Sequence, residues 1–142
     1  MFTIRKKKRF EMAHKLASSY SVECQQIHGH SYIAEIFISA EKVNEDGMVI
    51  DFKLLNEVVN PIINQFDHKL VIFNGDLSDA LVTEKMVELP FNPTAELMAE
   101  WFAVKIKEGL ELLTEVEMVE LTVRLHETDT GWAQYTIKGN EK

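Results

Sequence analysis

Three histidines and the single cysteine of the chain lie within its first 30 residues. The segment "CQQIHGHSY" contains Cys24, His28 and His30, and His14 precedes it. Imidazole nitrogens and thiolates bind transition metals, and the same groups move protons in enzymes. The segment is therefore a candidate metal site, a candidate nucleophile beside its base, or a turn whose imidazoles have no chemical role.

Alternation of apolar and polar residues places the three histidines on one face of a sheet. Residues 2–14 and 30–40 alternate as half-buried strands do. His14 falls in the apolar phase of the first segment, and His28 and His30 fall in that of the second. If the strands pair as an antiparallel hairpin, the imidazoles converge, and three ligands with an open fourth position are typical of catalytic zinc. Taken singly, each histidine is more often a hydrogen-bonded core residue.

Cys24 has three interpretations that the residues alone leave open. As a fourth ligand it would close the metal site and favour a structural role. As a buried thiol it would be inert, which is the commonest role of a lone cysteine. As a thiolate stabilised by a nearby metal and imidazoles it would be reactive.

Two acidic positions are further candidates. Asp67 precedes His68 directly, so its carboxylate can orient the imidazole for proton transfer. The alternative is a surface pair at the end of a helix. Glu127 continues the apolar phase of a strand expected near 116–126, and a carboxylate at the end of a buried face needs a partner. Because the neighbouring basic residues lie in the opposite phase, a bound ligand is a candidate for that partner.

Two helices are expected between the strands. Asp51 is suited to cap a helix that runs to Phe66, with a kink or an interruption at Pro61. A second helix is expected to begin with Asn92 as its cap and Pro93 in its first position. Its predicted buried face consists of Leu97, Trp101 and Val104.

The order of these elements predicts an α+β fold. Two strands precede the helices, and two more are expected at 116–126 and 132–138, whereas 69–91 reads as irregular. We expect one domain over residues 1–142, built as a four-stranded antiparallel sheet with both helices on one face. The two open edges of such a sheet favour edge-to-edge assembly into a barrel.

Composition narrows the class of protein. The 142 residues are 46% hydrophobic and 27% charged, which fits a globular protein with one core. A net charge of -8 argues against nucleic acid as a partner, and the basic run at 5–9 is either a solvated strand edge or a contact for an anionic substrate. No apolar run is long enough to span a membrane. A single cysteine cannot form an internal disulfide, so we expect a cytoplasmic location.

Six motifs in register resemble one family of enzymes. They are "FEMAHKL", "CQQIHGHSY", "GMVIDF", "FDHK", "NPTAE" and "HETDTGWAQY", and they extend over nearly the whole chain. The sequence resembles the 6-pyruvoyltetrahydropterin synthase and 6-carboxytetrahydropterin synthase family. The resemblance implies the T-fold, in which four-stranded antiparallel sheets with two helices each join into barrels, commonly as a hexamer of two trimers.

The resemblance also implies the metal and the thiol chemistry. His14, His28 and His30 match the family's Zn²⁺ ligands, and Cys24 matches the catalytic thiol that moves a proton on the substrate side chain. The substrate would be 7,8-dihydroneopterin triphosphate. Zinc would acidify its side-chain hydroxyls and stabilise the charge that develops when a proton leaves.

Further residues receive roles by the same resemblance. Asp67 and His68 match a catalytic acid–imidazole pair that a neighbouring subunit contributes. Glu127 matches the carboxylate that binds the pterin through its N–H donors, and Thr94 and Glu96 match residues that line the same pocket.

Two products are known in this family. One branch keeps the side chain as a pyruvoyl group, and the other loses acetaldehyde to give the 6-carboxy product of the queuosine pathway. The spacing from Cys24 to His28 resembles the bacterial 6-carboxy branch, so we expect that product. The segment between His68 and Asn92 is longer than in familiar members, and it is a place where substrate choice can change.

Functions of another class remain alternatives. A non-catalytic pterin- or metal-binding T-fold protein would need the histidines and Glu127, but not Cys24, Asp67 and His68 together. A structural zinc protein with Cys24 as its fourth ligand would unfold when the metal is removed, whereas a catalytic site would leave a folded, inactive apoprotein.

Overall fold

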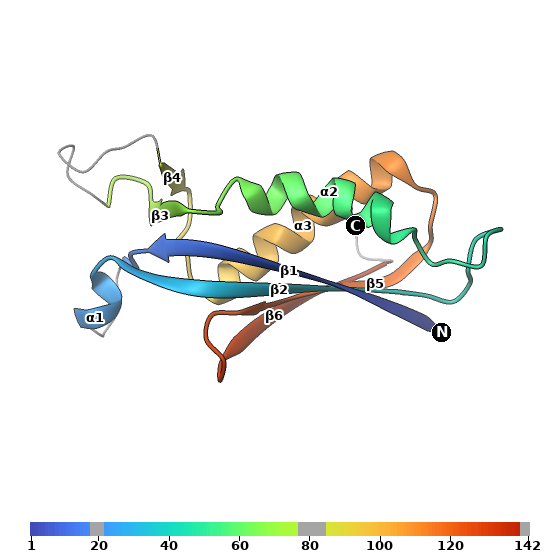
Figure 1. Ribbon diagram of the computed structural model, residues 1–142, viewed down its shortest axis with the longest axis horizontal. Coiled ribbons are helices and arrows are strands. Elements are labelled where there is room, and N and C mark those ends of the chain that lie inside the picture. Colours follow the sequence, from blue (N-terminus) through green and yellow to red (C-terminus); the bar gives the residue numbers. More distant parts are fainter. Residues whose placement is uncertain (18–21, 77–84, 140–142) are drawn as a thin grey trace.

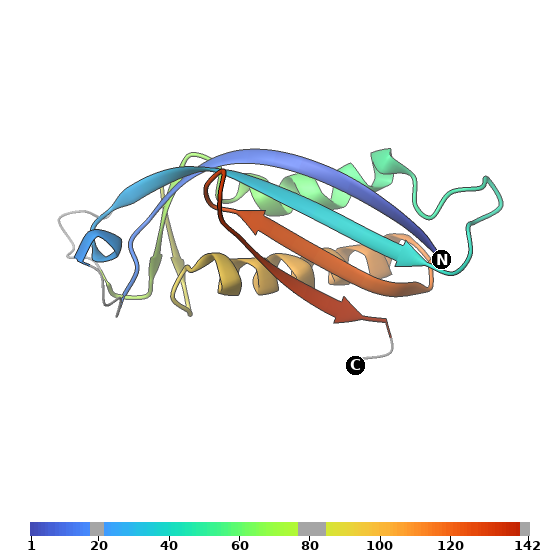
Figure 2. The ribbon, with the colours of Figure 1, turned by 90° about the horizontal axis from the view of Figure 1, so that it is seen from below.

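A twisted sheet with two long helices against one of its faces forms the body of the molecule (Figures 1 and 2). The computed structural model describes residues 1–17, 22–76 and 85–139. The elements in chain order are β1 (Phe2–His14), α1 (Val22–Gln25), β2 (His28–Ala40), α2 (Phe52–Asn64), β3 (Lys69–Phe73), β4 (Met86–Leu89), α3 (Ala95–Leu113), β5 (Met118–His126) and β6 (Trp132–Lys138). Among the described residues, no helix is long and apolar enough to cross a membrane.

The sheet has six strands in the order β4-β3-β1-β2-β5-β6. Strands β1, β2, β5 and β6 are antiparallel neighbours, as expected, but β3 runs parallel to β1 and β4 runs parallel to β3. The prediction of a purely four-stranded antiparallel sheet is therefore wrong. The two added strands lie in the segment 69–91, which the sequence indicated as irregular. Val71 and Ile72 are fully buried there, so this short apolar run forms a strand against the end of β1.

The pairing of β1 with β2 sets the position of the three histidines. The two strands form one uninterrupted antiparallel ladder from Phe2 opposite Ala40 to His14 opposite His28. Strand β2 begins at His28, two residues before the predicted start, and this brings His28 into the regular alternation. Because alternate side chains share a face, the histidines follow the same face as the buried Tyr32.

Helix α2 begins as predicted and ends at Asn64, two residues before its predicted end at Phe66. The Asp51 carboxylate accepts a hydrogen bond from the Lys53 amide at 2.8 Å, which caps the helix. The helix runs through Pro61 to Asn64, so the expected interruption does not occur. A proline removes one backbone hydrogen bond, but the turns around it are held against the sheet by buried apolar residues, namely Leu55, Val58, Val59 and Ile63.

Helix α3 differs from its prediction in cap and in face. Thr94, and not Asn92, is the N-cap, and its Oγ1 accepts a hydrogen bond from the Leu97 amide at 3.2 Å. Leu97 and Val104, expected in the core, are each 38% exposed. The buried residues are Met98, Ala99, Phe102, Ala103, Ile106 and Leu110. Apolar residues occur on both sides of this helix, so periodicity alone did not select the correct face.

Two edges of the sheet are open over most of their length. Within the described part of the chain, β3 pairs with β1 only over Met12–His14, which leaves Phe2 to Glu11 of β1 without a strand on that side. Strand β6 forms the opposite edge. These edges agree with the predicted open edges of the antiparallel part of the sheet.

Candidate metal and catalytic site

The three histidines converge where β1 ends and β2 begins. Their candidate ligand atoms all lie within 4.8 Å of one another, and they form the metal-suited group found among the described residues. His14 Nε2 and His28 Nε2 are 2.8 Å apart. His14 is fully buried, whereas His28 and His30 are partly exposed, so the group is reached from one side.

Backbone carbonyls fix the orientation of two of these rings. His14 Nδ1 lies 2.9 Å from the carbonyl oxygen of Pro93, and His28 Nδ1 lies 2.8 Å from that of Gln26. In each pair the ring N–H donates to the carbonyl, since a carbonyl only accepts. The Nε2 atoms of both rings are then free to act as lone-pair donors, which is how outer contacts orient histidine ligands around a metal.

The electrostatics of the site favour the neutral forms of His14 and His30. Burial lowers the pKa of His14 to about 4, against the raising effect of its hydrogen bond to Pro93, and the other two histidines lower it further. Burial also lowers the pKa of His30, although the carboxylate of Glu127 opposes this shift. A neutral imidazole with a fixed tautomer is the form that binds metals. The donor set therefore fits a divalent metal ion held by three imidazoles.

Glu127 lies beside this group. Its Oε1 is 3.3 Å from His14 Nε2 and 3.6 Å from His30 Nε2. The hydroxyl of the buried Tyr32 lies 3.3 Å from His14 Nδ1, and burial together with the Glu127 carboxylate raises the pKa of Tyr32. The carboxylate at the end of the apolar phase of β5 thus has protein neighbours, and it remains about one-third exposed toward a ligand.

Asp67 and His68 lie at the open edge of β1. Asp67 Oδ1 accepts a hydrogen bond from the Glu11 amide at 2.9 Å, and His68 Nδ1 lies 3.0 Å from the same carboxylate oxygen. The Glu11 amide, followed by His68, lowers the pKa of Asp67. His68 has a φ of 59° and its side chain is 74% exposed. A bulky residue in this backbone region is uncommon and is often found at functional positions.

A hollow of about 590 Å³ lies beside His68 and one of the three histidines. His68 and His30 both line it, and Ser31, Lys69 and Leu70 are among its other lining residues. The structure therefore brings Asp67 and His68 to the same end of the sheet as the three histidines.

Cys24 is a free, partly buried thiol in the short helix α1. Its carbonyl accepts a hydrogen bond from the Leu16 amide at 3.0 Å, which ties α1 to the end of β1. Cys24 is not a member of the metal-suited group, which consists of the three histidines. This separation counts against the hypothesis that it closes the site as a fourth ligand.

The residues of "NPT" have three different structural tasks. Asn92 Oδ1 accepts a hydrogen bond from the Ala17 amide at 2.9 Å, Pro93 holds His14, and Thr94 caps α3. Glu96 is exposed in the first turn of that helix. The contact of Pro93 with His14 was missed from sequence, because any residue can offer a backbone carbonyl and no residue type signals it.

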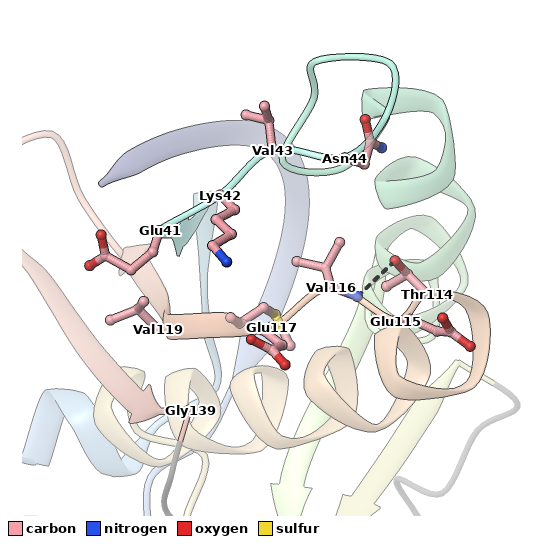
Figure 3. A pocket seen from close by; sticks show the side chains of 11 residues that line it. Glu41, Lys42, Val43, Asn44, Thr114, Glu115, Val116, Glu117, Val119 and Gly139 are labelled. Atoms are coloured by element: carbon pink, nitrogen blue, oxygen red, sulfur yellow. Dashed lines mark hydrogen bonds between the residues drawn. The ribbon is translucent and has the colours of Figure 1, made fainter.

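Another hollow, of about 530 Å³, lies at the opposite end of the sheet (Figure 3). Glu41 follows the end of β2 there, and Met118 and Val119 begin β5. Its labelled side chains are mainly acidic and aliphatic, and its lining contains no histidine or cysteine. The histidine group suited to a metal ion lies at the other end of the sheet.

The sequence and the fold match one known family. The sequence profile described as 6-pyruvoyl tetrahydropterin synthase matches residues 3–138, and the chain belongs to this family. A 6-carboxy-5,6,7,8-tetrahydropterin synthase of Aquifex aeolicus is 32% identical, over 80% of this chain and 75% of that protein. One from Helicobacter pylori is 30% identical, over 97% of this chain and 74% of that protein.

Solved structures agree on the fold. The 6-pyruvoyl tetrahydropterin synthase of Plasmodium falciparum superposes with a TM-score of 0.80 at 21% identity, and the match covers 96% of this chain and 98% of that one. A protein from Wolinella succinogenes gives 0.78 at 20% identity, over 99% and 98% of the two chains. The chain therefore has the T-fold of this family, and it is an enzyme of the tetrahydropterin synthase kind.

Proposed function

We propose that this enzyme converts 7,8-dihydroneopterin triphosphate into 6-carboxy-5,6,7,8-tetrahydropterin, a queuosine precursor. The reaction consumes water and releases triphosphate and acetaldehyde, so that one side-chain carbon becomes the carboxyl group and the other two leave together. The observation that carries this proposal is the group of three converging imidazoles beside Glu127, in a chain whose relatives bear this name.

The three histidines would hold a divalent metal, and we propose that it is Zn²⁺. Such an ion supplies Lewis acidity, which makes the side-chain hydroxyls of the substrate easier to deprotonate. Three neutral nitrogen ligands fit zinc, and they accept other divalent ions as well.

Proton transfers fall to the chain's own side chains. We assign Cys24 as the base that removes a proton from the substrate side chain. His68 exchanges a proton with a side-chain oxygen, and Asp67 keeps its ring oriented through the 3.0 Å contact at Nδ1. The triphosphate departs with its bonding electron pair.

Recognition of the pterin is assigned to Glu127. A carboxylate can accept two hydrogen bonds from the paired N–H donors of a pterin ring, and burial of such a pair gives strong discrimination. Thr94 and Glu96 are proposed to lie at the edge of the same pocket. Thr94 can still donate its hydroxyl proton, since its oxygen only accepts in the helix cap.

We infer that the enzyme works as a hexamer of two trimers. Strand directions alternate from β1 through β2 and β5 to β6, so β6 of one copy and β1 of the next would pair antiparallel and close a barrel. Asp67 and His68 lie at that open edge of β1, a position that supports their action in a neighbouring copy's site. A cytoplasmic setting is likewise an inference, which the single cysteine supports.

A turnover assay tests the proposed function. Metal-loaded protein is incubated anaerobically with 7,8-dihydroneopterin triphosphate, and release of triphosphate is measured against metal-free protein and Cys24→Ala. We expect release only with the metal-loaded wild type. Substrate that binds tightly without release would favour the non-catalytic alternative, in which the T-fold only binds pterin.

A further inference from the structure

A carboxylate is buried on the face of the sheet that no helix covers. Glu35 lies in the middle of β2, and alternation places it opposite the buried apolar residues of that strand. It is only 8% exposed. Buried carboxylates are rare unless they are paired, and the proton-transfer and pterin-binding roles assigned above make no use of this residue.

Each oxygen of Glu35 has its own partner on a neighbouring strand. His126 of β5 donates from Nε2 to Oε1 at 2.5 Å, and Arg5 of β1 donates from Nη1 to Oε2 at 3.0 Å. Burial raises the pKa of Glu35, but the hydrogen bonds from His126 and Arg5 outweigh this and lower it below its usual range. The contacts join three strands at the buried carboxylate, and the Arg5 side chain is itself 54% exposed.

His126 is the last residue of β5, and Glu127 follows it directly. Their side chains point to opposite faces, because His126 contacts Glu35 whereas Glu127 lies beside His14 and His30. The backbone of Glu127 already belongs to the next turn, since its amide donates to the Gly131 carbonyl at 3.2 Å. The direction of the Glu127 carboxylate therefore depends on where β5 ends. His126 holds this end through its hydrogen bond to Glu35 on the opposite face of the sheet.

We propose that Glu35 and His126 are positioning residues for Glu127. Their hydrogen bond holds the end of β5, and this aims the Glu127 carboxylate at the pterin ring beside the three histidines. The inference rests on the proposed function, because it takes Glu127 as the pterin-binding group. A purely structural role would strengthen the sheet without changing pterin affinity.

Pterin binding by metal-loaded variants tests this role. Glu35→Leu keeps the volume and removes both hydrogen bonds, His126→Phe removes only the donor, and Glu35→Gln retains an oxygen for His126. Thr122→Val is a matched control, because it removes a 2.6 Å cross-strand hydrogen bond to Thr136 between β5 and β6. Neopterin serves as the probe, with its affinity measured by fluorescence and the bound metal by elemental analysis.

We expect Glu35→Leu and His126→Phe to bind neopterin about tenfold more weakly, with unchanged metal content. Glu35→Gln should lie between these variants and the wild type, and Thr122→Val should match the wild type. In turnover, KM should rise by a similar factor while kcat changes less. If Glu35→Leu and His126→Phe bind neopterin as tightly as the wild type does, the positioning role is overturned. The proposed function is not affected by that result.

A double-mutant cycle with Glu127→Gln separates action through Glu127 from general damage. If Glu35 acts through Glu127, adding Glu35→Leu to Glu127→Gln should weaken binding no further. A second tenfold loss in that background would overturn the inference. A wild type that binds no neopterin would overturn the proposed function, and the positioning role would fall with it.

Discussion

His14 Nδ1 lies 2.9 Å from the carbonyl oxygen of Pro93, although 79 residues separate the two in the chain. Pro93 immediately precedes Thr94, the N-cap of α3, so the start of this helix and the orientation of a metal-suited imidazole are set together. The backbone of one element thus fixes the chemistry of a side chain on another.

Replacing Thr94 tests how much the N-cap of α3 contributes to the stability of the protein. Thr94→Ala loses the hydrogen bond to the Leu97 amide, so the free energy of unfolding should fall by about 1 kcal/mol. Thr94→Ser keeps the hydroxyl and should retain the stability of the wild type. Urea unfolding measures both. Equal stability of Thr94→Ala and the wild type would contradict the capping role.

Removing the metal should leave a folded protein. The apolar core is continuous beneath the sheet and does not depend on the three histidines for its packing. We therefore expect chelator-treated protein to keep its circular dichroism spectrum and a cooperative urea transition, while triphosphate release stops. His28→Ala should behave in the same way without chelator. Unfolding on chelation would instead indicate a structural metal.

The stability of the metal-free protein should depend on pH because of His14. The pKa of His14 is about 4 in the folded protein, against an ordinary value of 6.5. Between pH 4 and pH 6.5 the unfolded chain therefore binds more protons than the folded one. Stability therefore rises with pH through this window and is lost as pH falls through it, by up to about 3 kcal/mol.

Urea unfolding of metal-free protein at pH 7 and pH 4.5 measures this dependence. His14→Gln removes the titrating group and should show a smaller loss of stability between the two pH values. An equal loss in the variant and the wild type would assign the effect to other groups.

Mixing two inactive variants tests whether sites are shared between copies. If His68 of one copy serves the site that holds Cys24 of the next, a Cys24→Ala and His68→Ala mixture, refolded together, should regain activity at about a quarter of its sites. Each variant refolded alone is the control and should stay inactive. No recovery in a mixed assembly of confirmed size would mean that one copy supplies both residues.

Side-chain periodicity was sufficient to predict the histidine group. Strand alternation fixes which face each residue takes, and His14, His28 and His30 needed only the pairing of β1 with β2 to meet. The bounds of β1 and β6 follow from the same alternation. The face of α3 was predicted wrongly because Leu97 and Met98 are both apolar, so burial was decided by packing against the sheet.

Contacts made by the backbone, or by residues distant in sequence, could not be predicted. The parallel pairing of β3 with β1 depends on the path of the chain through α2. The five residues of β3 show no alternation of apolar and polar side chains. The hydrogen bond between Glu35 and His126 depends on the register of β2 against β5, which the sequence does not reveal. From sequence alone, charged residues on the face of the sheet that no helix covers are expected to be exposed to solvent.

Identification of the product tests the central claim most directly. Zinc-loaded protein is incubated anaerobically with 7,8-dihydroneopterin triphosphate, and the pterin is identified by mass spectrometry beside a Cys24→Ala control. We expect 6-carboxy-5,6,7,8-tetrahydropterin together with acetaldehyde, and neither in the control. A 6-pyruvoyl product, or unchanged substrate with the zinc-loaded wild type, would contradict the proposed reaction.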